Sequence, residues 1–345
     1  MSEREESRLT AALVIGSALL LSLFTVFLHA KAMGRAYVET HQVPRHLALL
    51  SGTAGNPWQY RVFSAWVVEG VHRAFDGLHV PDSLVAAFLA VRIGQEILMF
   101  VVAWAYWRAL GIATHPALLG MAILGWSVSY GNYGSDFQFN TYFDVLFYVL
   151  AGLAVVRGRW GWVVPITLLA ALNRETSGFI PLLPLAAAWR AAPEVRTRAI
   201  RVAAIALAVY GVTFVALRWA YGRQDLIIPY GHRPGLDLLG YNLSHARTWV
   251  QLAGTLSIVP IVALLSYRSW PRTLRAFGWM LVPAWFAIHW VIAVMSETRL
   301  LLVPMALVLV PGRCCPSGRC NPRTKRRACP GREPPRPDPG HSGIV

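Results

Sequence analysis

The chain contains 345 residues, of which 55% are hydrophobic and only 14% are charged. Water-soluble globular proteins are considerably more polar, so this composition excludes most soluble enzyme folds and predicts a membrane protein. The formal net charge of +15 would suggest a nucleic-acid partner in a soluble chain. Here the positive residues fall in the C-terminal tail and in loops between apolar runs, so we expect the lipid bilayer as partner and no nucleic acid.

The apolar runs predict an all-α fold, a polytopic transmembrane bundle of about ten helices within residues 1–311. The runs cover residues 9–29, 83–107, 116–130, 140–156, 161–172, 177–189, 202–221, 249–267, 274–295 and 300–310. The first run has a long apolar core and a nearly neutral leader, which favours an uncleaved span over a signal peptide. Three runs, 161–172, 177–189 and 300–310, are too short to cross a bilayer alone, so we expect partial helices or segments that dip into the membrane.

The last 34 residues, 312–345, form a separate segment with eight Lys or Arg, two acids and seven prolines. This composition predicts a basic, disordered tail. Its abrupt start also leaves open a reading-frame error or a truncated C-terminus. All four cysteines lie here, and their spacing fits no zinc site; they are Cys314, Cys315, Cys320 and Cys329.

The loop charges predict the orientation of the chain in the inner (plasma) membrane. With the N-terminus in the cytoplasm, every short inner loop contains arginine, as the positive-inside rule requires. The inner loops carry, in chain order, Arg108, then Arg157 and Arg159, then Arg190, Arg196, Arg198 and Arg201, then Arg268 and Arg272. The outer loop 222–248 departs from the rule with three arginines, whereas the outer connection 131–139 has no Lys or Arg. Most acids then face outward, so we expect any chemistry on the extracytoplasmic side.

The first extracytoplasmic loop, residues 30–82, is the longest connection between predicted spans. Its middle, 56–75, has apolar residues at helical spacing, which predicts an amphipathic helix lying in the headgroup plane. Such a helix is either a membrane-surface brace or a wall of a groove in which a lipid-linked substrate presents its phosphate to Arg61, next to Tyr60.

Two of the predicted spans contain acidic side chains. Arg92 and Glu96 are four residues apart and share one helix face. An isolated charge at mid-bilayer costs about 2.5–3.5 kcal/mol, so they form either a structural ion pair or the wall of a polar pocket. Asn140 and Asp144 lie at the outer mouth of the run 140–156, and Asp144 is too deep to be a helix cap.

A polar turn, Asn173-Arg174-Glu175-Thr176, separates two short apolar half-spans, an arrangement typical of irregular backbone beside a polar cavity. Near the C-terminus, Glu297 and Arg299 again place a glutamate close to an arginine, as Arg174 and Glu175 do in the polar turn. A Glu beside an Arg can hold a sugar hydroxyl or a phosphate, or can simply pair with its neighbour. The sequence has no P-loop, dinucleotide-binding glycine pattern, HExxH or nucleophile elbow, so soluble nucleotide chemistry has no support.

The predicted architecture resembles that of the C-type (GT-C) membrane glycosyltransferases. The shared features are a cytoplasmic N-terminus, a long first outer loop with an interfacial helix, about ten spans and acids that face outward. The stretches 57–61 (PWQYR), 140–144 (NTYFD) and 173–177 (NRETS) also look like a group of uncharacterised bacterial membrane proteins of that plan. The resemblance covers about residues 9–311 and is architectural more than motif-level.

The resemblance implies a polyprenyl-phosphate sugar as donor and an acid of the first outer loop as general base or metal ligand. An acceptor hydroxyl must lose a proton, and arginines can hold the departing phosphate, a role for Arg61, Arg174 and Arg299. The loop has no paired acids, so Glu39 is the closest candidate base and Asp136 the second, and a divalent cation stays an open question.

Two other functions fit the sequence. Arg92, Glu96, Asp144 and Glu175 would line the path of a secondary transporter for a polar or anionic substrate. Such transporters usually carry matching interrupted helices in two halves, whereas this chain has one strong interruption, at 173–176. A noncatalytic membrane subunit is the other alternative, because no catalytic motif is complete.

Overall fold

The computed structural model describes residues 3–132, 135–228 and 231–314. In this part the predicted all-α fold is confirmed, and the only strand-like contact is an isolated bridge between Asn56 and Leu226. The predicted tail begins at residue 312, yet helix α16 (Val310–Cys314) continues past that boundary and buries Gly312 against Trp270. The remainder of the tail, including Cys315, Cys320 and Cys329, lies outside the described residues.

Among the described residues, five helices are long and apolar enough to cross a membrane, which fits a multi-pass membrane protein. They are α1 (Glu3–Met33), α5 (Ser83–Ala109), α7 (Phe139–Val156), α10 (Pro193–Tyr221) and α14 (Arg272–Ile292). A sixth span results if α12 (Ala246–Leu256) and α13 (Val259–Leu265), bent by 58°, are counted together. The predicted run 249–267 breaks there because Ser257 adopts a positive φ of 50° and Pro260, within the first turn of α13, has no N–H.

The other predicted runs form helices that are either shorter or less apolar than these spans. They are α6 (Thr114–Gly131), α8 (Val163–Ala171), α9 (Leu182–Ala188) and a C-terminal series of 3₁₀, α and π turns from Thr298 to Leu309, which includes α15 (Leu302–Pro304) and leads into α16. α11 (Leu236–Ser244) precedes α12.

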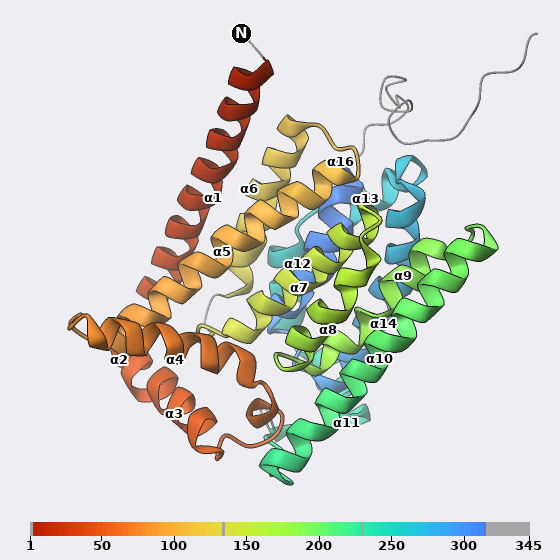
Figure 1. The fold of residues 1–345 in the computed structure, drawn as a ribbon. Helices are drawn as coiled ribbons and strands as arrows, with labels where there is room; N and C mark the ends of the chain where they lie inside the picture. Colours follow the sequence, from red (N-terminus) through yellow and green to blue (C-terminus); the bar gives the residue numbers. More distant parts are fainter. Residues whose placement is uncertain (1–2, 133–134, 229–230, 315–345) are drawn as a thin grey trace, which may run out of the picture.

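Helix α7 is the centre of the bundle. Its apolar window is 83% buried inside the protein, against 22–44% for the other four long helices. Figure 1 shows α5 and α8 beside it. At the periphery, α1 exposes large apolar side chains such as Leu20 (69%) and Phe27 (64%), as expected of a helix that faces lipid.

The helices run back and forth between two ends of the molecule (Figure 1). The N-terminus shares one end, which we call the arginine end, with the turns 110–113, 157–162, 189–192 and 266–271. Contacts of Arg198 with the Trp160 ring (5.7 Å) and of the Cys314 thiol with Pro116 O (3.3 Å) join these turns. The arginine-rich turns that the sequence assigns to one side therefore lie at one end of the bundle.

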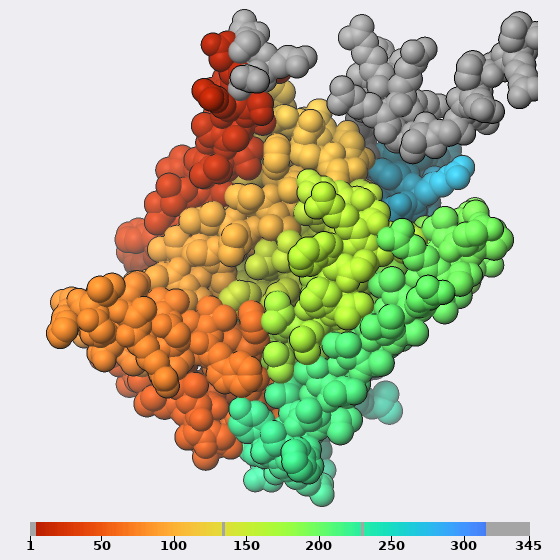
Figure 2. Space-filling model, viewed as in Figure 1, coloured from red at the N-terminus to blue at the C-terminus, as the bar shows by residue number. Residues whose placement is uncertain are grey.

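The opposite end, called the pocket end, carries residues 34–82, 135–138, 172–181, 222–228 and 231–235. Residues 34–82 project there as one corner of the molecule, orange in Figure 2. They comprise α2 (Arg35–Tyr37), a π turn (Val38–Gln42), α3 (Val43–Ser51), a 3₁₀ turn (Trp58–Tyr60) and α4 (Val62–Gly77).

The amphipathic helix is present as α4, but it starts at Val62 and not at residue 56. Gly52 and Gly55 have positive φ values of 83° and 71°, so the chain turns there before the helix can begin. The face buried in the protein contains Val62, Ala65 and Val68, whereas Trp66 of the predicted apolar face is 50% exposed.

Helices α6 and α12 pack closely at Gly254, where an added Cβ would overlap the Tyr130 ring. We expect Gly254→Ala to lower the free energy of unfolding by about 1–3 kcal/mol, the usual cost of overpacking. Gly94→Ala in α5 is the matched control, since a Cβ there has no neighbour within 4 Å and the substitution favours helix. Thermal unfolding in detergent compares the two, and equal stability of both variants would contradict the close packing.

Candidate functional site

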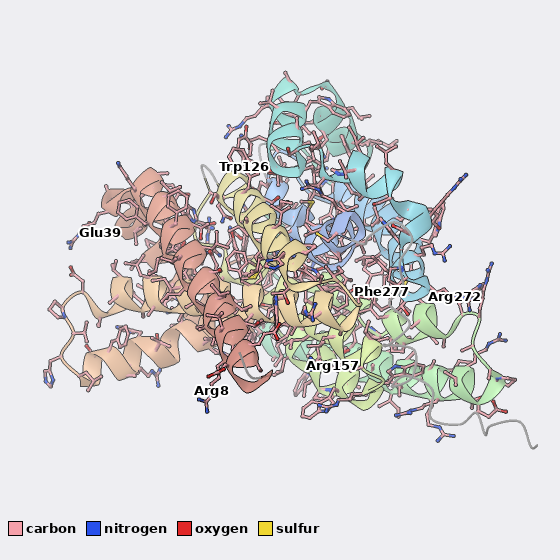
Figure 3. All side chains as sticks on the ribbon, turned by 90° about the horizontal axis from the view of Figure 1, so that it is seen from above. Arg8, Glu39, Trp126, Arg157, Arg272 and Phe277 are labelled. Atoms are coloured by element: carbon pink, nitrogen blue, oxygen red, sulfur yellow. The ribbon has the colours of Figure 1, made fainter. Side chains whose placement is uncertain are left out.

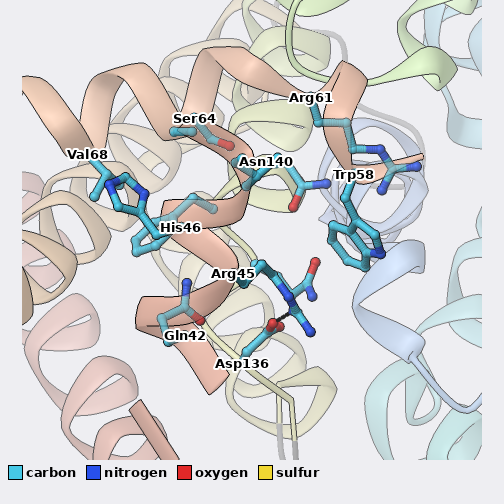
Figure 4. A pocket seen from close by; sticks show the side chains of 13 residues that line it. Gln42, Arg45, His46, Trp58, Arg61, Ser64, Val68, Asp136 and Asn140 are labelled. Atoms are coloured by element: carbon cyan, nitrogen blue, oxygen red, sulfur yellow. Dashed lines mark ion pairs between the residues drawn. The ribbon is translucent and has the colours of Figure 1, made fainter. Parts of the chain in front are cut away.

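A cavity opens at the pocket end between α3, α4 and residues 136–140 (Figure 4). It has an empty volume of about 430 Å³, including open space at its mouth. Its polar or aromatic lining residues are Gln42, Arg45, His46, Trp58, Arg61, Ser64, Asp136, Gln138, Phe139 and Asn140. The cavity therefore collects side chains from the first loop and from the segment before α7, two regions that the sequence singled out separately.

Arg45 of α3 and Asp136 form an ion pair within the cavity, marked by the dashed line in Figure 4. The Asp136 side chain is only 4% exposed, whereas that of Arg45 is 35% exposed. A buried carboxylate thus faces an accessible guanidinium, which is a group suited to binding an anion.

The segment 136–139 is held in place by side chains of α5 and the first loop. Arg92 Nη1 donates to Phe137 O (3.1 Å) and Gln95 Nε2 to Phe139 O (3.0 Å). The Phe137 amide in turn donates to Gln42 Oε1 (3.2 Å). Because Gln138 has a positive φ of 39°, the chain turns sharply there before α7 begins. These bonds fix Asp136 at the cavity wall.

Arg61, at the start of α4, links the cavity to the 172–179 segment. Its Nη2 and Nε lie 2.9 and 3.1 Å from Glu175 Oε2. Burial tends to raise the pKa of Glu175, but the Arg61 charge, hydrogen bonds to the carboxylate and the Arg174 charge together outweigh this effect and lower the pKa. The Trp58 ring lies 4.8 Å from the Arg45 guanidinium carbon and 5.3 Å from that of Arg61, so one indole supports both cations.

Acid is expected to weaken the Arg61–Glu175 link. The pKa of Glu175 lies below its ordinary 4.5 in the folded protein, so the pair stabilises the fold fully above about pH 4.5 and loses this contribution as the pH falls through the lowered pKa. Glu175→Gln lacks the contribution at every pH. Melting temperatures of wild type and Glu175→Gln, measured from about pH 7 to about pH 3, should therefore converge in acid, and a constant difference would contradict the assignment.

A second polar cluster lies deeper, where the start of α7 meets the turn after α8. Asn173 Nδ2 donates to Asn140 O (2.7 Å), and Arg174 Nη1 lies 3.9 Å from Asp144 Oδ2. Burial lowers the pKa of Arg174 to about 10, so its guanidinium stays charged at neutral pH. Asp144 Oδ1, Asn173 Oδ1 and Arg174 Nε are buried without a hydrogen-bond partner. The structure therefore brings together Asn140, Asp144, Asn173 and Arg174, with Glu175 between this cluster and the cavity.

Three predicted site residues lie elsewhere. Glu39 is 50% exposed, pairs with Arg35 (2.7 Å) and points away from the molecule at its outer edge (Figure 3). Tyr60 is buried and donates to Gly222 O (2.8 Å), so it fastens the first loop to the 222–228 segment. Glu297, 34% exposed, does not line the cavity.

Three further residues that the sequence predicted for the site, Arg92, Glu96 and Arg299, form ion pairs with nearby residues and do not line the cavity. Arg92 and Glu96 are both fully enclosed within the bundle, with Arg92 Nε 3.0 Å from Glu96 Oε1. The Arg92 guanidinium also lies 3.0 Å from the centre of the Tyr142 ring. Arg299, 4% exposed, is 2.6 Å from the Glu297 carboxylate, beside Gly131.

Sequence reasoning missed Arg45, His46 and Trp58. Arg45 departs from the positive-inside rule by lying in a predicted outer loop, and this departure is the signal that could have identified it. His46 is buried and its Nε2 lies 3.3 Å from Glu69 Oε2; burial lowers its pKa.

Within the described residues, no group of three or more His, Cys, Asp or Glu is arranged to hold a metal ion.

Comparison with known proteins gives no family for this chain. No family model, no curated protein and no solved structure matches it. The resemblance to GT-C enzymes therefore rests on the plan and the residues quoted above, and the geometry of the cavity is the best guide to function.

Proposed function

We propose that this protein is an integral membrane glycosyltransferase-like enzyme that transfers a sugar from a polyprenyl-phosphate-type donor on the extracytoplasmic side of the plasma membrane. The observation that carries the proposal is one cavity lined by a buried carboxylate, Asp136, and by two guanidinium groups, those of Arg45 and Arg61. Sugar transfer from a lipid phosphate needs this combination, a base for the acceptor and cations for the leaving phosphate.

In the proposed reaction the acceptor hydroxyl oxygen attacks the anomeric carbon of the sugar. The bond between that carbon and the phosphate oxygen breaks, and polyprenyl phosphate leaves with the electron pair. Asp136 accepts the hydroxyl proton, while Arg45 and Arg61 stabilise the negative charge that develops on the leaving oxygen.

The lipid chain of the donor stays in the bilayer beside α4. In this arrangement α4 lies in the headgroup plane, with Trp66 and its apolar neighbours directed to lipid and Ala65 and Val68 directed to the cavity. The positive-inside rule supports a cytoplasmic arginine end and N-terminus, which puts the pocket end outside. The remaining shorter helices complete a bundle of about ten helices at membrane depth.

Transfer is tested with purified protein in liposomes that contain a polyprenyl-phosphate hexose labelled in the sugar, together with a bacterial envelope extract as acceptor source. The expected result is release of polyprenyl phosphate and appearance of the label on a component of the extract. A donor that remains intact in every extract tested would contradict the proposal.

A secondary transporter is the second candidate, and the deeper cluster favours it. Asp144 and Arg174 are buried inside the bundle, and polar atoms of both have no partner there. Buried ionisable groups of this kind often line substrate paths. In the same liposomes a transporter would accumulate a polar or anionic substrate without any covalent change, whereas the proposed enzyme would change the donor chemically.

A further inference from the structure

We infer that the Asp136 carboxylate is a built-in competitor for the donor phosphate: it occupies Arg45 in the empty cavity, and a lipid phosphate that binds Arg45 displaces it. The inference rests on the proposed function and describes how the same site is regulated. Binding of the donor would thereby release the base that the reaction needs.

The charges of the cavity favour such an exchange. Each of its two arginines already has a carboxylate partner, Asp136 for Arg45 and Glu175 for Arg61. The site thus offers no excess of positive charge at these two groups. A phosphate that binds the guanidinium edge now held by a carboxylate displaces that carboxylate and gains the ion pair in its place.

Exposure indicates which pair exchanges. The Arg45 side chain is 35% exposed, whereas that of Arg61 is 14% exposed. A ligand entering the cavity therefore reaches the Arg45 guanidinium more readily. The Trp58 ring, 4.8 Å away, would keep this guanidinium in place after its carboxylate has left. A planar guanidinium binds a phosphate through two parallel hydrogen bonds, so the exchange replaces one good partner by another.

After the Asp136 carboxylate has lost Arg45, its backbone would stay at the cavity wall. The neighbouring Phe137 holds it there, because the Phe137 amide and carbonyl are hydrogen-bonded to Gln42 and Arg92. In the part of the chain that the structure describes, Arg45 is the only ion-pair partner of Asp136. A buried carboxylate that loses its cation takes up a proton more readily. The base would therefore become effective only when the phosphate of the donor is in the cavity.

The test measures binding of polyprenyl monophosphate to the purified full-length protein by native mass spectrometry. Asp136→Asn is expected to bind at least about fivefold more tightly than the wild type, since the internal competitor is gone. Asp82→Asn is the matched control, because it removes the same charge from an exposed position at the same end, outside the cavity lining. It should leave the affinity unchanged. The double variant Arg45→Gln/Asp136→Asn should not bind polyprenyl monophosphate more tightly than the wild type, because the guanidinium that binds the phosphate is absent.

Polyprenol, which has the same lipid chain without the phosphate, should bind all four proteins equally. Unchanged or weaker binding of the phosphate lipid to Asp136→Asn would overturn the inference, as would its failure to bind any of the four. The assay contains no sugar, so its outcome is independent of transfer. A wild type that binds as expected but never releases polyprenyl phosphate from a sugar-bearing donor would contradict the proposed function alone.

Discussion

Asp136→Asn is expected to lower the rate of sugar transfer by about 10²- to 10⁴-fold, the usual contribution of a general base. Asparagine has nearly the same shape but cannot accept the acceptor's proton. Because Arg45 is partly exposed, it can be solvated when its carboxylate is removed, so the protein should remain folded. The measurement is the initial rate of polyprenyl phosphate release in liposomes, with the melting temperature as the check on folding.

Glu39, the acid that the sequence favoured first as the base, provides the comparison. Glu39 is exposed, paired with Arg35 and distant from the cavity lining. A full loss of transfer in Glu39→Gln together with full activity in Asp136→Asn would assign the base to Glu39 and contradict the account. Asp82→Asn serves again as the control for a lost surface charge.

Arg92→Met is expected to lower the free energy of unfolding by about 3–5 kcal/mol, because it leaves the Glu96 carboxylate buried without its cation. The substitution also removes the hydrogen bond to Phe137 O and the contact with the Tyr142 ring. Denaturant unfolding in detergent measures the loss.

A second Arg–Glu pair with the same four-residue spacing is the matched control. Arg73 of α4 pairs with Glu69 (2.7 Å), but its side chain is 78% exposed. Arg73→Met should therefore cost about 1 kcal/mol or less. If both variants unfold at the same denaturant concentration, the buried Arg92–Glu96 pair does not stabilise the fold more than an exposed pair does, which contradicts the prediction.

Local sequence patterns were sufficient for the all-α fold and for the Arg92–Glu96 pair, but not for the number of spans: about ten were predicted, whereas five or six helices among the described residues are long and apolar enough to cross a membrane. Apolar runs predict helices because each run must bury or expose a continuous apolar face, and an i,i+4 pair depends only on helix geometry. The break after residue 172 was also predictable, since Asn173 and Arg174 could not continue an apolar helix. The bend at Ser257 was not predictable, because one residue with a positive φ does not change the hydropathy pattern.

The cavity depended on tertiary contacts that no local pattern contains. Arg45 and Asp136 are 91 residues apart and meet only because α3 folds back over the segment before α7. The sequence ranked Glu39 before Asp136, because Glu39 lies in the first outer loop, where the resemblance places the base. Only the packing shows that Asp136 is buried at the cavity and that Glu39 is exposed at the outer edge.

The central claim, that the pocket end faces away from the cytoplasm, is tested most directly by cysteine labelling in intact cells. The described body up to residue 313 has no cysteine, so a variant with the four tail cysteines changed to serine accepts single probes. A probe at Ser51→Cys, exposed at the pocket end, should react with a membrane-impermeant maleimide, whereas one at Ala192→Cys, exposed at the arginine end, should react only after permeabilisation. The reverse pattern would place the cavity in the cytoplasm and contradict the account.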